Sequence, residues 1–153
     1  MTIRLMTAAD APTVAALSAQ LGYPISPTVI AERLDMLSQS PEHGCFVAGW
    51  EGVVVGWIHV FGVHMITSPH FFAEVGGLVV DAGARRQGVG RALMSQAEAW
   101  AQAHSYSEVR LRSGLSRTGA HAFYQSIGYE LTKTSHMFRK ALGIGEPVFQ
   151  PMP

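Results

Sequence analysis

The sequence predicts a mixed α/β domain of the α+β type, with about four helices flanking one central, mostly antiparallel sheet. Three observations predict this fold class. Two segments with helical spacing of apolar residues come first, at 7–22 and 26–41. A run rich in β-branched and aromatic residues follows from 44 to 63. From residue 71 onward, strand patterns alternate with helix patterns, which favours layers packed around a single sheet.

The composition fits one soluble globular domain. The chain has 153 residues, of which 48% are hydrophobic and 14% charged, with 11 basic and 11 acidic side chains. Balanced charge disfavours nucleic-acid binding. No uncharged run approaches the roughly eighteen residues of a membrane span, and Asp10 and Pro12 interrupt any apolar centre of a signal peptide. We therefore expect a cytoplasmic protein without nucleic-acid or membrane partners, and a charge-poor surface suited to a homodimer.

The elements before the sheet are a short strand and two helices. Alternating apolar and polar residues predict a strand at 1–6, and helical spacing predicts helices over 7–22 and 26–41. The second helix has clear start signals, because Ser26 suits the N-cap and Pro27 the first helical position.

A hairpin is predicted next, from two apolar runs at 44–50 and 53–63 that the turn dipeptide Glu-Gly at 51–52 separates. After a loop at 64–70, a third apolar strand is expected over 71–81.

The second half of the chain alternates helices and strands. A helix over 89–104 presents one apolar face made by Val89, Leu93, Ala97 and Trp100. A strand at 107–114 and a helix at 116–128 follow, and 129–142 is expected to form one or two final strands. The last residues, 143–153, contain three prolines and form a predicted surface tail.

Residues 84–93, "ARRQGVGRAL", lie between the third strand and the long helix. Amides at the start of a helix lack partners and lie at the positive end of its dipole, so an anion is their natural ligand. Gly88 and Gly90 let a phosphate approach the backbone, and three arginines add positive charge: Arg85, Arg86 and Arg91. The alternative is a simple helix start with incidental arginines.

Two common nucleotide loops are disfavoured at this turn. The dinucleotide fingerprint needs a third glycine where Leu93 stands. A P-loop needs Lys and then Ser or Thr where Val89 and Gly90 stand.

The segment "RRQGVG" matches (Gln/Arg)-x-x-Gly-x-(Gly/Ala), and with it the chain resembles the GNAT superfamily of N-acetyltransferases. The stretch "FYQSIGYE", about thirty residues downstream, is similar to that family's next helix and strand. The resemblance extends from residue 3 to about residue 142 and implies a GNAT-like fold, with a single domain over 1–142 ahead of the tail.

The resemblance implies that the acyl donor is acetyl-coenzyme A (acetyl-CoA). Its pyrophosphate would be held by the loop residues Arg85, Arg86, Gln87, Gly88, Val89, Gly90 and Arg91. The preceding strand would offer backbone hydrogen bonds to the pantetheine arm from Leu78, Val79 and Val80. We expect at least two of these three side chains to be part of the core as well.

Two residues are candidates for catalysis in the resemblance. Glu74 would accept the proton of the acceptor amine, although it could instead bond a backbone amide. Tyr124 would assist the departing thiolate, although it could instead pack with Phe123 and Ile127. Arg117 replaces the asparagine often found earlier in this helix, which removes one expected contact to the donor.

The remaining chemistry-bearing residues suggest no metal. His43 and Cys45 alternate on one strand and supply two ligands at most. Cys45 is predicted to be a small core residue rather than a nucleophile. His64 and His70 are expected to be solvated loop residues, with lining of the acceptor site as the alternative.

The sequence therefore predicts transfer of an acetyl group to a primary amine by direct attack. The acceptor would be a small molecule or a peptide. Two alternatives stay open: transfer of a longer acyl group, and a catalytically inactive module that senses coenzyme A.

Overall fold

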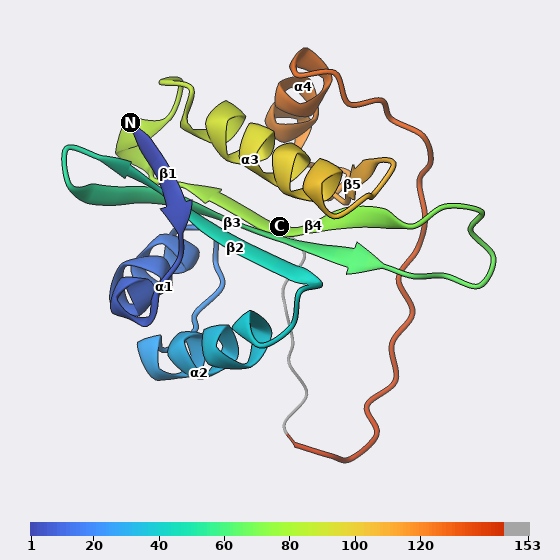
Figure 1. Ribbon diagram of the computed structural model, residues 1–153, viewed down its shortest axis with the longest axis horizontal. Coiled ribbons are helices and arrows are strands. Elements are labelled where there is room, and N and C mark those ends of the chain that lie inside the picture. Colours follow the sequence, from blue (N-terminus) through green and yellow to red (C-terminus); the bar gives the residue numbers. More distant parts are fainter. Residues whose placement is uncertain (146–153) are drawn as a thin grey trace. The chain divides into compact units, whose positions relative to one another are not determined.

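The structure is a computed structural model that describes residues 1–145 (Figure 1). The chain falls into two compact units, 1–112 and a second unit that begins at Ser113, and each is described by itself. Most of the predicted tail at 143–153 lies outside the described residues. Within residues 1–145, no helix has the length and apolar character needed to cross a membrane.

The first unit is built on a five-stranded sheet whose strands follow one another in sequence order. They are β1 (Thr2–Leu5), β2 (His43–Trp50), β3 (Val53–Val63), β4 (Phe72–Val80) and β5 (Val109–Leu111). Neighbouring strands are antiparallel except β4 and β5, which are parallel. The predicted hairpin with its turn at 51–52 is confirmed.

Helices cover both faces of this sheet. Figure 1 shows α1 (Ala11–Gln20) and α2 (Pro27–Ser38) on one face and α3 (Val89–Ala103) on the other. Short 3₁₀ turns precede α1 and α3, at Ala8–Asp10 and Ala82–Ala84. The predicted mixed α/β class is therefore confirmed.

The face that α3 packs on the sheet is the one that the sequence predicts. Val89, Leu93 and Ala97 are each at most 1% exposed, and Trp100 is also buried. The predicted cap of α2 is confirmed as well, because the Ser26 hydroxyl accepts a hydrogen bond from the Val29 amide at 3.2 Å.

Asp10 fixes the start of α1 against β1. Its carboxylate accepts two hydrogen bonds from the Arg4 guanidinium and one from the Thr7 amide, all at 2.8 Å. These bonds, with Arg4 foremost, hold the pKa of Asp10 below its ordinary value, although burial opposes them. A group with a depressed pKa in the folded state stabilises the fold above its unfolded pKa, and this contribution is lost as the pH falls.

Asp10→Asn is expected to lower the free energy of unfolding by about 1–2 kcal/mol at pH 7. The substitution removes the negative charge of a buried carboxylate, so the hydrogen bonds that this group accepts from Arg4 and Thr7 are lost or weakened. The deficit relative to the unmodified protein should shrink as the pH falls below about 4, where Asp10 becomes protonated in the unfolded chain, and should disappear once the folded carboxyl is protonated as well. Urea unfolding of both proteins at pH 7 and pH 3 measures this. An equal deficit at both pH values would contradict the account.

The second unit contains α4 (Thr118–Ser126). The helix ends in a Schellman motif, in which the Tyr129 amide bonds to the Tyr124 carbonyl at 3.0 Å and the Gly128 amide to the Gln125 carbonyl at 3.1 Å. The stretch "YQSIGY" is therefore a helix C-terminus with its cap.

The prediction of one or two strands over 129–142 is wrong. The described residues of this segment form neither strand nor helix. Its apolar side chains are exposed, including Leu131, Met137 and Phe138 at 77%, 78% and 92%. Alternation predicts a strand only if a partner strand satisfies its backbone and one face is covered, and neither condition holds here.

Candidate functional site

A β-bulge divides strand β4 into two parts. His59 of β3 pairs with Gly77 while Val60 pairs with Val75, so Gly76 is an extra residue with no partner on β3. On its other edge, β4 pairs with β5 only over Ala73–Val75. Among the described residues, no strand pairs with that edge beyond the bulge, over residues 76–80. We call this segment the open edge of β4.

The open edge contains the residues expected to contact the pantetheine arm. Val79 is buried, whereas Leu78 and Val80 are only half-buried. The expectation that at least two of the three belong to the core is therefore wrong. The reason is that β5 ends at Leu111 and leaves the end of β4 without a neighbour on one side.

Residues 85–91, the glycine-rich loop, lead from β4 into α3. Gly88 is the N-cap of α3 and has φ +81°, a left-handed conformation that favours glycine. A Cβ built on Gly88 would meet no atom within 4 Å, so the space beside its backbone is open. Among the described residues, the amides of Arg86 to Arg91 find no acceptor.

The three arginines of this loop, Arg85, Arg86 and Arg91, are exposed and form no ion pair with another described residue. Open amides, a helix N-terminus and unpaired cations are the features that a phosphate group requires. The loop therefore has the features of an anion-binding site.

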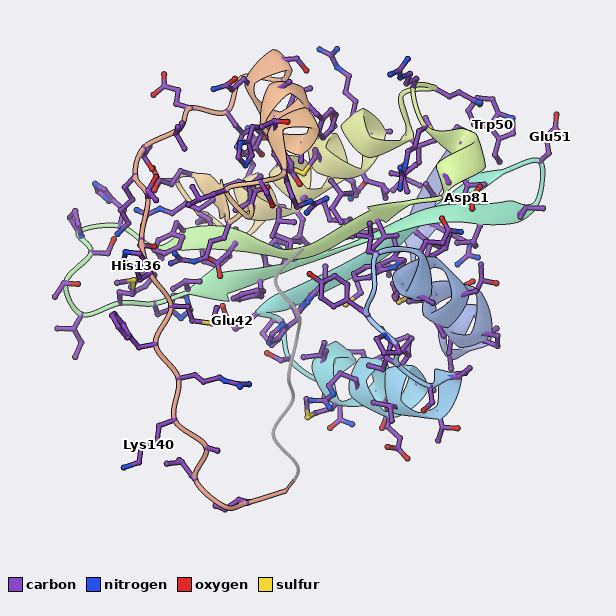
Figure 2. The ribbon with its side chains drawn as sticks, turned by 180° about the vertical axis from the view of Figure 1, so that it is seen from behind. Glu42, Trp50, Glu51, Asp81, His136 and Lys140 are labelled. Atoms are coloured by element: carbon purple, nitrogen blue, oxygen red, sulfur yellow. The ribbon has the colours of Figure 1, made fainter. Side chains whose placement is uncertain are left out.

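Gln20, at the end of α1, binds residues 81 and 82, which connect β4 to the glycine-rich loop. Its side chain donates to Asp81 Oδ1 at 2.8 Å and accepts from the Ala82 amide at 3.0 Å. Asp81 in turn accepts from the Gly83 amide at 3.0 Å. Figure 2 shows Asp81 at the end of the sheet where the β2–β3 turn with Glu51 also lies. No local sequence pattern marks Gln20, because this contact joins residues 61 positions apart.

Glu74 lies in β4, two residues before the bulge, and pairs with Phe61 on one side and Arg110 on the other. Its side chain is 22% exposed, and its Oε1 atom lies 3.6 Å from Nε of Arg112, which is itself 71% exposed. Such an exposed ion pair stabilises a fold little. The ion pair therefore gives this half-buried carboxylate next to the bulge only a weak structural role.

Two histidines form a pair on the face of the sheet that α1 and α2 cover. His43 Nδ1 and His59 Nε2 are 3.0 Å apart, and both rings contact Phe61. Burial, and then the charge of His43, lower the pKa of His59 to about 4, so His59 is neutral at physiological pH. His59 is not among the residues predicted from the sequence, although its alternation with Trp57 and Phe61 in an apolar strand indicates that it faces the same side of the sheet as those rings.

Cys45 is partly buried on the same face, and burial raises the pKa of its thiol to about 11. A thiol with this pKa carries almost no thiolate at neutral pH, which agrees with the prediction that Cys45 is not a nucleophile. Within residues 1–145, no three His, Cys, Asp or Glu side chains are grouped as metal ligands would be.

The two loop histidines have different surroundings. His64 is an exposed loop residue, as predicted, and it also lies 3.5 Å from Glu42 and contacts the rings of Tyr106 and Phe71. His70 lines an open, polar depression of about 250 Å³ together with Ser105 and Ser107.

A second cavity, of about 150 Å³, lies between the helices α1 and α2 and the sheet. Apolar residues of the two helices line it, including Val14, Ile30, Leu34 and Leu37. The sheet contributes Trp57 and His59, and Arg33 of α2 lies at its wall. We call this space the helix-covered cavity.

Tyr124 lies in the second unit, on α4, whereas Glu74 and the glycine-rich loop lie together in the first. Burial raises the pKa of the Tyr124 phenol, and the nearby Arg117 opposes this rise. The Tyr124 ring contacts Phe123 and Tyr129. A phenol that stays protonated at neutral pH can donate a proton or a hydrogen bond.

Known proteins resemble this chain in sequence. It is 36% identical over 97 residues to N-acetyltransferase 8 of Homo sapiens, covering 63% of this chain and 43% of that protein. It is also 36% identical over 76 residues to aminoglycoside N(6')-acetyltransferase type 1 of Acinetobacter haemolyticus, covering 50% of this chain and 51% of that protein. The chain thus spans about half the length of these curated relatives.

The fold is shared with solved structures. One of them, AAC(6')-Iy in complex with the bisubstrate analog CoA-S-monomethyl-acetylneamine, has a TM-score of 0.81 at 19% identity and covers 92% of this chain and 97% of its own. The profile of the acetyltransferase (GNAT) family matches residues 14–129, which includes β4, the glycine-rich loop and α4. This chain therefore belongs to the GNAT family of acetyltransferases.

Proposed function

We propose that this protein transfers the acetyl group of acetyl-CoA to a primary amine of a small molecule. One observation carries this proposal: the glycine-rich loop offers unpaired amides and cations at the start of α3, next to the open edge of β4. An elongated donor with a pyrophosphate at one end and hydrogen-bonding amides along its arm suits these two features.

In this proposal the amides of residues 86–91 hold the pyrophosphate, and Arg85 adds charge beside them. The backbone of Leu78, Val79 and Val80 binds the pantetheine arm. The thioester then lies toward the bulge at Gly76, on the strand that carries Glu74.

The acceptor must lose a proton before it attacks. An alkylammonium of pKa about 10.4 costs about 4–5 kcal/mol to deprotonate at pH 7. Glu74 accepts this proton through a water molecule. The amine nitrogen bonds to the acetyl carbon, and the carbon–sulfur bond breaks. The nitrogen loses its second proton as the amide forms, and the thiolate gains one proton from Tyr124, which recovers its own from the nitrogen through solvent.

The relatives support an acceptor that is a small-molecule amine, since one of them is named for the acetylation of aminoglycosides. A peptide amine remains the alternative acceptor.

We also propose that residues 1–142 act as one domain and that the protein works in the cytoplasm. We further propose that it forms homodimers, for which exposed apolar residues such as Ile66 and Phe71 offer contact area.

The test is release of free coenzyme A thiol from acetyl-CoA in the presence of a broad panel of primary amines. Thiol release that depends on the amine, with an N-acetylated product, is the expected result. Tight binding of coenzyme A without turnover of any amine would instead favour an inactive sensor module. A faster reaction with a longer acyl-CoA would favour transfer of a longer acyl group.

A further inference from the structure

The helix-covered cavity is large enough for part of a small acceptor. A cavity of about 150 Å³ that apolar side chains line can hold a benzene-sized group, and the helix-covered cavity has about this volume. Its lining is dominated by the apolar side chains of α1 and α2, and the Ser18 hydroxyl already donates to the Val14 carbonyl at 2.7 Å. The body of the occupant must therefore be compact and apolar.

The cavity reaches the strand on which the reaction is proposed to take place. His59 lines the cavity and pairs with Gly77, which is next to the bulge at Gly76. Glu74 lies on the same strand, two residues before that bulge. An occupant whose amine is at the His59 end would thus present it beside the bulge. His59 is neutral at physiological pH, so it does not repel an ammonium group there.

One cation at the cavity wall has no ionic partner among the described residues. Arg33 lines the cavity, is exposed, and forms no ion pair with a described residue. Its planar guanidinium can donate two parallel hydrogen bonds to a carboxylate, and such charge-assisted bonds are stronger than neutral ones. Arg33 therefore favours a negatively charged oxygen group on the occupant.

None of the described residues that line the cavity is acidic. A polycation would bring several positive charges beside Arg33 with no carboxylate to balance them, which is unfavourable. This distinguishes the cavity from a site for polyamines or aminoglycosides.

We propose that the helix-covered cavity is the acceptor site, and that it selects a compact amine with an apolar body of about benzene size and a carboxylate that Arg33 binds. This inference rests on the proposed acetyltransferase function. Its substrate class is that of apolar amino acids and similar amino acids with an aromatic group.

The test compares matched probe amines and one substitution. L-phenylalanine has the apolar body and the carboxylate, 2-phenylethylamine lacks the carboxylate, and spermidine is a polycation. Binding is measured by calorimetry, and acetylation by thiol release from acetyl-CoA. We expect kcat/KM to be highest for L-phenylalanine and lowest for spermidine.

Arg33→Gln should weaken L-phenylalanine binding about tenfold and change 2-phenylethylamine binding less than about twofold. Arg33 is exposed, so its loss should leave the fold intact. Glu32→Gln is the matched control, because it removes an exposed charge from the same helix at a residue that does not line the cavity. It should leave both probes unaffected.

The outcomes separate this inference from the proposed function. Preference for spermidine over L-phenylalanine, or an equal effect of Arg33→Gln on both phenyl probes, would overturn the inference while acetyl transfer stands. Absence of L-phenylalanine binding would overturn it too. Binding that depends on Arg33 without thiol release from any amine would support the cavity assignment and refute the transferase function.

Discussion

Gly88→Glu is expected to abolish binding of acetyl-CoA. The substitution places a side chain and a negative charge in the open space where the pyrophosphate is proposed to lie. A loss of at least about a hundredfold in affinity corresponds to about 2.7 kcal/mol, a reasonable cost for displacing a phosphate from several amides. Calorimetric titration with coenzyme A measures the effect.

Gly52→Glu provides the matched control for this variant. Gly52 has the same φ of +81° and no atom within 4 Å of a built Cβ, but it lies in the β2–β3 turn. Both variants therefore carry the same backbone strain and the same added charge. Normal affinity for coenzyme A in Gly88→Glu would refute the assignment of the loop, whereas loss of affinity in both variants would point to a general effect of strain or charge.

Glu74→Gln is expected to lower kcat about a hundredfold at pH 7, within the range usual for loss of a general base. The loss should become smaller as the pH rises toward the pKa of the acceptor amine, because the free amine then forms without a base. A pH profile of kcat for the best amine of the panel measures this, with coenzyme A affinity as the check that the donor still binds.

Arg112→Gln separates a catalytic from a structural role of Glu74. It removes the ion partner at 3.6 Å and keeps the carboxylate. If Glu74 acts as the base, Arg112→Gln should keep most of the activity, and the unfolding free energy should change little in either variant. A parallel loss of stability in both, with a pH-independent fall in kcat, would show that the carboxylate serves the fold.

The elements that are predicted well from sequence are those whose signals are local. Ser26 caps α2 and the apolar face of α3 is buried, because a cap and a helical repeat are decided within a few residues. The glycine-rich loop was found for the same reason. Its open amides follow directly from Gly88 at the start of a helix.

What the sequence does not reveal depends on residues far apart in the chain. The apolar alternation at 129–142 suggested strands, but no partner strand lies beside it among the described residues. The pairing of His43 with His59, and the cavity that His59 lines, require β2, β3 and two helices to be in place. Glu74 is a candidate from the sequence alone because its neighbours are apolar, which makes a carboxylate stand out.

The contact of Gln20 with the 81–82 backbone has a mechanical consequence. Helix α1 contributes Val14 to the helix-covered cavity and, about one and two-thirds turns later, Gln20 to the segment that leads into the glycine-rich loop. The helix cannot slide along the sheet without breaking two hydrogen bonds at this point. Helix α1 therefore links the proposed acceptor cavity rigidly to the proposed donor loop, and a shift of α1 at the cavity would also displace the segment that leads into the loop.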